Sequence, residues 1–183
     1  MSIKGEIITE ERIGFEKSNK ALGYIYKEWY EIISKQLSEI DGINIELGCG
    51  ASFINQINKS IKKTDVFLNS NTDFKLNAMD IGDRFENQIS NLILINVFHH
   101  ISDPEFFLKA AEKSLLVGGR IIMIEPSNNY WSRLVYKLIG HEPFDTRQIE
   151  WKFESKDPLL DSNQALSWII FERDYQKFKN LFP

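Results

Sequence analysis

The chain has 183 residues, of which 43% are apolar, 26% charged and 13% aromatic. A chain of this length can bury roughly 70% of its unfolded surface in one domain, which excludes a disordered or fibrous protein. The 22 Lys and Arg residues stand against 26 Asp and Glu residues, for a formal net charge of -4. Both signs are interspersed, so the sequence offers no basic face for nucleic acid.

Three features of the sequence indicate the cellular location of the protein. The central apolar run 92–95 is far shorter than the ~20 residues that a membrane span requires. The acidic first eleven residues lack the basic flank and apolar stretch of a secretory signal. The single cysteine, Cys49, excludes an internal disulfide and favours a reducing compartment. We therefore expect a soluble, cytoplasmic protein with no membrane span.

The first part of the chain predicts a helix, a strand, a glycine turn and a second helix. Apolar residues at helical spacing indicate an amphipathic helix over 21–40. A short buried strand is expected over 43–47, and it runs into the glycine turn 48–50. A helical segment is expected behind this turn over 51–60.

The alternation continues in the middle of the chain, where further strands are predicted over 61–65, 74–78 and 91–97. Asp103 can cap a helix that begins at Pro104 and ends at Gly118 and Gly119. The β-branched run 120–124 predicts another strand. Apolar strands that alternate with helices are typical of a parallel sheet covered on both faces, so we predict an α/β, doubly wound, mostly parallel Rossmann-like fold.

The glycine turn after the first strand is the expected ligand site, because ligands bind at the carboxyl ends of strands in such sheets. Glu46 precedes Gly48 and Gly50, whose backbone a ligand can approach closely. A dinucleotide fingerprint needs a third glycine at position 53, where this chain has Phe53. A carboxylate beside the turn suits a ligand that carries an ammonium group better than a phosphate.

Several motifs resemble class I S-adenosylmethionine-dependent methyltransferases over roughly residues 40–126. They are Glu46-x-Gly48-x-Gly50 after the first strand, the segment 96–104 (NVFHHISDP) after the fourth, and 115–122 (LLVGGRII) before the fifth. The segments 25–30, 141–145 and 163–171 resemble an uncharacterised bacterial branch of that superfamily. Position 52, which is often a third glycine in the family, is Ser52.

The resemblance implies a methyl group transferred from S-adenosylmethionine to a small-molecule acceptor, with S-adenosylhomocysteine as the product. It implies cofactor contacts from these residues: Glu46, Gly48, Gly50, Asp65, Asn77, Ala78 and Asn96. Asp65 at the end of the second strand is expected to hold the ribose hydroxyls, with Asp73 as the rival. Asn77 and Ala78 stand where the family often has Asp and an apolar residue at the adenine.

His99 and His100 follow the fourth strand, where the family's methyl donor faces its acceptor. A neutral imidazole suits proton removal, and the alternative role is packing beneath the cofactor. Positioning of the acceptor contributes roughly 7–11 kcal/mol against about 3–5 kcal/mol from a general base, so transfer mainly by positioning is expected. With His141 and Glu142, the two histidines form a set of potential metal ligands. No H-x-x-x-H motif or Cys pair supports a metal site, and no metal is predicted.

We expect a single domain with an N-terminal helical cap (1–41), a cofactor-binding core (42–126) and an acceptor-side segment (127–183). The run 167–171 predicts a sixth strand, with a helix over 174–181 behind it. Two residues remain for the returning seventh strand of the family, so the C-terminal strand is expected to be missing. An open edge near Ile122 and Ile169 would then favour a homodimer through the sheet edge.

Two other functions stay open at this stage. A truncated or non-catalytic relative would bind the cofactor weakly. Ser52 and Asn77, which differ from the residues that the family often has, support this alternative. An NAD(P)-dependent Rossmann oxidoreductase is suggested by Tyr175-x-x-x-Lys179, the spacing of a short-chain dehydrogenase pair. Cys49 is expected to be a packed residue rather than a nucleophile.

Overall fold

A computed structural model describes residues 10, 11, 13–15, 18–56, 58–130, 132, 133, 142–155 and 161–183. These residues form two compact units. Unit 1 draws on Met1–Ile95 and Leu108–Ile124, and unit 2 on Asn96–Phe107 and Glu125–Pro183. The helix α4 (Pro104–Ser114) has residues in both.

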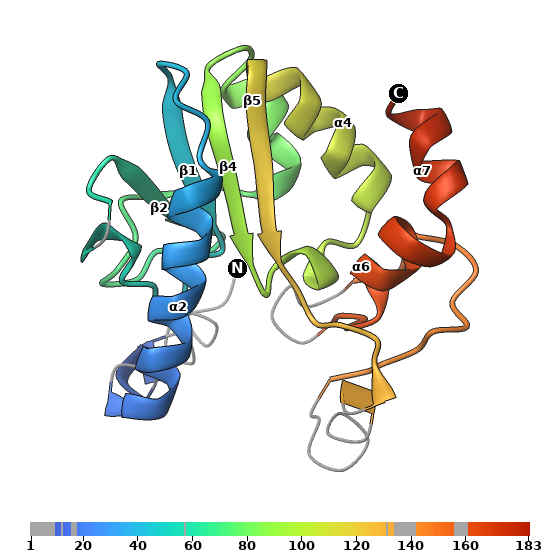
Figure 1. The fold of residues 1–183 in the computed structure, drawn as a ribbon, viewed down its shortest axis with the longest axis horizontal. Coiled ribbons are helices and arrows are strands. Elements are labelled where there is room, and N and C mark those ends of the chain that lie inside the picture. The colour runs from blue at the N-terminus through green and yellow to red at the C-terminus, as the bar shows by residue number, and fades with distance from the viewer. Residues whose placement is uncertain are drawn as a thin grey trace. The chain divides into compact units, whose positions relative to one another are not determined.

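Unit 1 is built on a parallel sheet of five strands in the order β3-β2-β1-β4-β5 (Figure 1). The strands are β1 (Ile43–Leu47), β2 (Ile61–Asp65), β3 (Phe74–Lys75), β4 (Ile89–Ile95) and β5 (Leu115–Ile124). The order reverses between β1 and β4, which is the switch point of a doubly wound sheet. This arrangement confirms the predicted α/β, Rossmann-like fold.

The helix α2 (Lys20–Gln36) covers one face of this sheet (Figure 1). Its first turn is capped by Asn19, whose side-chain oxygen accepts hydrogen bonds from two backbone amides. Tyr30 and Ile33 are fully buried and belong to one core cluster with Ile61 and Ile93 of the sheet. Part of the predicted stripe thus packs on this core (Tyr26, Trp29, Ile33 and Leu37), whereas Ile25 is exposed. The predicted helix over 21–40 was too long at its end, since α2 ends at Gln36.

The predicted helix over 51–60 is wrong. Within the described residues, this stretch holds a single 3-10 turn, η1 (Ile54–Gln56). Ser52 accepts a hydrogen bond from the Ile54 amide, and Asn58 accepts one from the Ser60 amide. Short polar side chains that bond to nearby backbone in this way compete with a helical ladder, and the helix does not form.

The helix α4 starts where the sequence predicted but ends earlier. Asp103 accepts a hydrogen bond from the Phe106 amide at 3.1 Å, which confirms the cap. The helix ends at Ser114, whose hydroxyl donates to the Ala111 carbonyl, and β5 begins at the next residue. Gly118 and Gly119 thus lie inside β5 and do not end the helix, because pairing of Leu115 with Ile89 draws this stretch into the sheet.

Two further short elements complete unit 1 after β3. They are the 3-10 turn η2 (Ala78–Asp80) and the helix α3 (Ile81–Arg84). The predicted third strand was therefore too long, because the chain turns into η2 at Ala78. The fourth strand begins two residues earlier than predicted.

Unit 2 contains the 3-10 turn η3 (Phe98–His100) and the helices α6 (Leu166–Trp168) and α7 (Tyr175–Leu181), joined by the π-helical turn η4 (Ile169–Arg173). The predicted sixth strand over 167–171 is wrong, since these residues are helical. Asn163 Oδ1 accepts a hydrogen bond from the Ala165 amide in the turn that precedes this helix. A short apolar run is compatible with a strand or with a buried helix, and these residues, with Ile169 completely buried, form the helix.

The open sheet edge is only partly as predicted. In the described part of the chain, β5 pairs with β4 and ends the strand order. Ile122 is partly buried, but Ile169, which was expected to be exposed beside the edge, is fully buried. The homodimer through this edge stays a prediction. None of the described helices has the length and apolar character needed to cross a membrane.

We predict that the packing face of α2 carries much of the stability of unit 1. Ile33→Ala should lower the free energy of unfolding by about 2–5 kcal/mol, because it empties a fully buried site. The neighbouring Ile32 is 53% exposed, so Ile32→Ala should change it by less than about 0.5 kcal/mol. Chemical denaturation followed by circular dichroism compares the two variants. Equal losses would contradict the assigned packing face.

Candidate functional site

The turn after β1 is formed by two glycines in the left-handed region. Gly48 has a φ of 61° and Gly50 a φ of 46°, which other residues rarely adopt. A Cβ at position 50 would meet nothing within 4 Å, so open space lies beside this backbone. The turn therefore leaves a cradle at the carboxyl end of the sheet, where the sequence predicted a ligand site.

Asp65, the last residue of β2, holds this turn. Its Oδ2 accepts a hydrogen bond from the Gly50 amide at 3.2 Å, and its Oδ1 accepts one from Phe67 at 3.1 Å. The rival Asp73 is exposed and accepts a hydrogen bond from the Lys63 amide at 2.7 Å. Asp65 is thus the acid at the end of β2 and next to the turn, as the sequence predicted for the strand end.

Two other side chains brace the turn, and sequence reasoning did not find them. The Tyr30 hydroxyl donates to Ser52 Oγ at 2.9 Å and accepts from the Phe53 amide at 3.3 Å. Asn71 donates to the carbonyls of Gly50 and Ser52 at 2.9 and 2.7 Å. Ser52 therefore has a bonding role in this chain. Tyr30 lies in the segment predicted to be helical, where the sequence gave no sign of this contact.

Glu46 is the buried acid of the turn. The residue is 2% exposed, and its Oε2 has no hydrogen-bond partner among the described residues. Burial raises the pKa of Glu46 to about 8, and the hydrogen bond to Ser52 and the charge of Lys63 offset this only in part. An acceptor oxygen without a donor in a buried site is costly unless a ligand supplies the donor.

Of the other predicted residues, Asp65, Asn77, Ala78 and Cys49 belong to unit 1. Burial also raises the pKa of Asp65. The Asn77 side chain accepts a hydrogen bond from Met79 and caps η2, which begins at Ala78. Cys49 is buried, and its pKa is raised by this burial, so it is a packed thiol without nucleophilic character. The predicted cofactor residue Asn96 belongs to unit 2, where it is exposed and has a φ of 54°.

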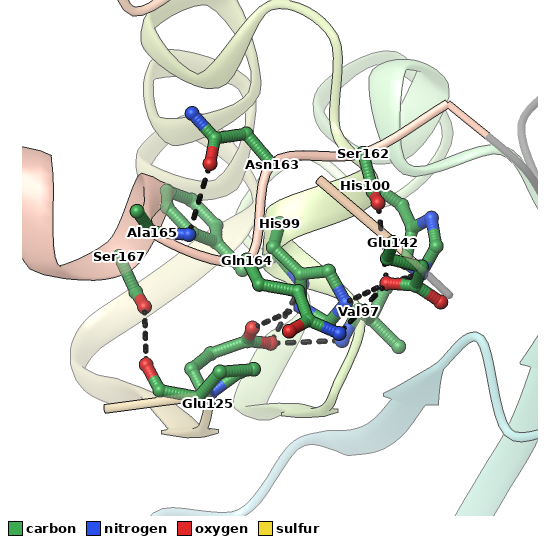
Figure 2. Close-up of polar contacts among 12 residues, drawn as sticks. Val97, His99, His100, Glu125, Glu142, Ser162, Asn163, Gln164, Ala165 and Ser167 are labelled. Carbon is green, nitrogen blue, oxygen red and sulfur yellow. Dashed lines mark hydrogen bonds and ion pairs between the residues drawn. The ribbon is translucent and has the colours of Figure 1, made fainter. Parts of the chain in front are cut away.

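A second cluster in unit 2 is built around Glu125 (Figure 2). One of its carboxylate oxygens, Oε1, accepts hydrogen bonds from the amides of Val97 and Phe98 at 2.8 and 2.7 Å. The other, Oε2, lies 2.6 Å from His99 Nδ1. Both side chains are nearly inaccessible, at 4% for His99 and 6% for Glu125. Glu125 therefore orders the turn η3 and orients the His99 ring.

Glu142 joins the two histidines on the other side of the cluster (Figure 2). Its Oε2 lies 3.3 Å from His99 Nε2 and 3.8 Å from His100 Nε2. Burial opposes a charge on His99, but the hydrogen bonds to Glu125 and Glu142 prevail and raise its pKa to about 9. The contact with His99 lowers the pKa of Glu142 to about 2, while burial and the charge of His99 lower the pKa of His100.

The sequence singled out both histidines and named Glu142 as a potential metal ligand, but it did not show that Glu125 and Glu142 contact His99. Glu125 lies 26 positions after His99, and Glu142 lies beyond a stretch with no strand pattern, so no local spacing links them. His141 lies outside the described residues.

Tyr175 and Lys179, whose spacing suggested an oxidoreductase, both lie on α7. The Lys179 ammonium is 5.8 Å from the centre of the tyrosine ring, and Tyr175 is 46% exposed.

The strand order and the glycine turn are those of a Rossmann-like α/β fold, and similarity to solved structures identifies it as the fold of class I methyltransferases. No family model matches the chain, and no curated protein matches it. Among solved structures, the citrinin polyketide synthase CMeT domain is similar, at 14% identity and a TM-score of 0.51, over 98% of this chain and 51% of that one. The CurJ carbon methyltransferase aligns at 14% identity and a TM-score of 0.49, over 92% of this chain and 49% of that one. The chain therefore spans about half the length of these structures, and likeness at this identity shows the fold alone.

We predict that Glu46 makes the stability of the chain fall with rising pH. Its folded pKa of about 8 lies above the ordinary 4.5, so the folded state keeps a proton that the unfolded state loses. The contribution of Glu46 is therefore complete below about pH 4.5 and is lost as the pH rises through about 8. Glu46→Gln removes this dependence.

The difference in free energy of unfolding between the native chain and Glu46→Gln should change by about 1.4 kcal/mol per pH unit within this window. The native chain should be the one that loses stability. Denaturation at a series of pH values measures this difference, and the exposed Glu28→Gln serves as the matched control. Parallel curves for all three proteins would contradict the raised pKa.

Proposed function

We propose that this chain transfers a methyl group from S-adenosylmethionine to a small-molecule acceptor. The observation that carries the proposal is the buried Glu46 Oε2, which has no partner among the described residues and lies beside a glycine turn at the carboxyl end of β1. The fold supports the same reading. A ligand with an ammonium group supplies the donor that this oxygen lacks.

The residues of the turn fit the parts of this cofactor. Glu46 would bind the ammonium of the methionine part, and the open backbone at Gly50 would let that part approach closely. Asp65 would accept hydrogen bonds from the ribose hydroxyls, since each carboxylate oxygen has capacity beyond the backbone amide it already accepts. Asn77 and Ala78 are the proposed adenine contacts.

An NAD(P) cofactor fits the turn less well. A dinucleotide pyrophosphate binds at the N-terminus of a helix that follows the turn. Between this turn and β2, the described residues form only the short 3-10 turn η1. The Phe53 ring packs edge-on against Tyr30 with the ring centres 5.1 Å apart, so its side chain has a packing role in this region.

When bound, S-adenosylmethionine supplies a methyl group already activated by its sulfonium. The contribution of the chain is then mainly to orient the acceptor and exclude water, which accounts for roughly 7–11 kcal/mol of a barrier. His100, with His99 beside it, is the proposed proton acceptor for a hydroxyl or carbon acid. This adds about 10²- to 10⁴-fold in rate.

Calorimetry with S-adenosylhomocysteine and with NAD tests the cofactor. Saturable binding of S-adenosylhomocysteine and none of NAD is expected. Asp65→Ala should weaken binding by about 10- to 100-fold, because it removes hydrogen bonds to a charged group, and Gly50→Val should abolish it by filling the open space. The matched control Asp73→Ala should change affinity little.

Weak binding that is insensitive to Asp65→Ala would favour a non-catalytic relative, and binding of NAD would favour the oxidoreductase. Circular dichroism of each variant separates lost binding from lost folding. The reverse ranking of Asp65 and Asp73 would contradict the assignment of the ribose contact.

The proton acceptor is tested with His100→Gln once an acceptor has been found by screening hydroxyl and carbon-acid compounds for S-adenosylhomocysteine release. Turnover should fall by at least about 10²-fold, while the affinity for S-adenosylhomocysteine is unchanged. Lower affinity with intact turnover would instead support the packing role.

A further inference from the structure

We propose that His99, His100 and Glu142 form a binding site for a divalent transition-metal ion, with Zn²⁺ as the probe. All three side chains belong to unit 2. Their ligand atoms lie within 4.8 Å of one another. The proposal goes beyond the proposed function and stands independently of it, because binding of the metal alone is measured.

The distances between these atoms approach those of a tetrahedral site. Bonds of about 2.0–2.2 Å to zinc place neighbouring ligand atoms about 3.4 Å apart. Glu142 Oε2 lies 3.3 Å from His99 Nε2 and 3.8 Å from His100 Nε2. The two imidazole rings are 4.4 Å apart between centres. Small side-chain rotations would therefore bring all three atoms to bonding distance of one ion.

A second set of contacts already orients the ligands. Glu125 lies 2.6 Å from His99 Nδ1, so a proton on Nδ1 leaves Nε2 as the ligand atom. Glu125 is itself held by two backbone amides. Ser162 and Gln164 donate to Glu142 Oε2 at 3.1 and 3.2 Å. A carboxylate that orients a ligating histidine is the usual support of a protein zinc site.

The crowding around Glu142 also points to a cation. Two imidazole nitrogens, a hydroxyl and an amide converge on the single oxygen Oε2. A carboxylate oxygen offers about two lone-pair sites, which the Ser162 and Gln164 hydrogen bonds already occupy, so the His99 nitrogen at 3.3 Å exceeds this capacity. A cation between Oε2 and the two imidazoles would convert two of these contacts into coordinate bonds.

The ligand set selects the class of metal. Two imidazoles and one carboxylate suit zinc, cobalt or nickel, whereas magnesium and calcium prefer all-oxygen sites. Three protein ligands leave a fourth position for water or for an oxygen atom of an acceptor. A coordinated His100 Nε2 cannot take up a proton, so metal binding and turnover are measured separately.

The test begins with the full chain, freed of any affinity tag and treated with a chelator. Isothermal titration with Zn²⁺ should give one site per chain, and Mg²⁺ should give no saturable heat. At a free Zn²⁺ concentration of 100 times Kd, the melting temperature should rise by about 5–10 °C. Co²⁺ should give the visible absorption of a tetrahedral site.

The variants separate ligands from supporting residues. Glu142→Gln and His100→Gln each remove a ligand and should weaken Zn²⁺ binding by at least about 100-fold. Glu125→Gln should weaken it by about 10- to 100-fold, with one site retained and a changed Co²⁺ spectrum. Glu150→Gln removes an exposed carboxylate of the same unit and should leave the affinity unchanged.

Absence of saturable Zn²⁺ binding by the native chain up to about 100 µM would overturn the proposal and leave an ion-pair cluster only. Equal affinity in the native chain and in folded His100→Gln would overturn it as well. Circular dichroism identifies a variant that does not fold, and the native titration decides in that case. Titration with S-adenosylhomocysteine in the same preparation shows separately whether the proposed function fails.

Discussion

Buried carboxylates accept hydrogen bonds from the free backbone amides of the turns that follow the strands of this protein. A parallel sheet leaves the chain to turn at the carboxyl end of each strand, and the free amides of these turns need acceptors. Asp65 accepts from two such amides after β1 and β2, and Glu125 accepts from two amides in the segment after β4. The positions of the glycine turn and of His99 depend on these two side chains.

Glu46 is the exception, because its Oε2 is buried and has no donor in the part of the chain that the structure describes. A buried charge without a partner is expensive, and the chain reduces this cost by keeping the carboxyl protonated to a high pH. The proposed binding of a ligand's ammonium group rests on this oxygen. Asp65 differs from Glu46 in this respect, because both of its carboxylate oxygens already accept hydrogen bonds from backbone amides.

In the cluster of unit 2, by contrast with Glu46, the charged groups are paired with one another. Glu125, His99 and Glu142 form a chain of contacts of 2.6 and 3.3 Å that stabilises a charged His99 and an ionised Glu142. Two imidazoles and a carboxylate brought this close favour either a proton or a metal ion between them. The proton and the metal ion therefore compete for the same nitrogen atoms.

The sequence alone determined β1, β2, the cap of α4 and the acids of the turn, because each depends on local periodicity or on a residue type at one position. Only the tertiary structure decided that 51–60 forms no helix, that 115–119 joins the sheet and that 167–171 is helical. Those segments carry ambiguous patterns, and contacts with distant residues select their conformation. The partners of His99 and the hydroxyl of Tyr30 at the turn were likewise decided by folding, since side chains 22 to 43 positions apart meet only when the chain is packed.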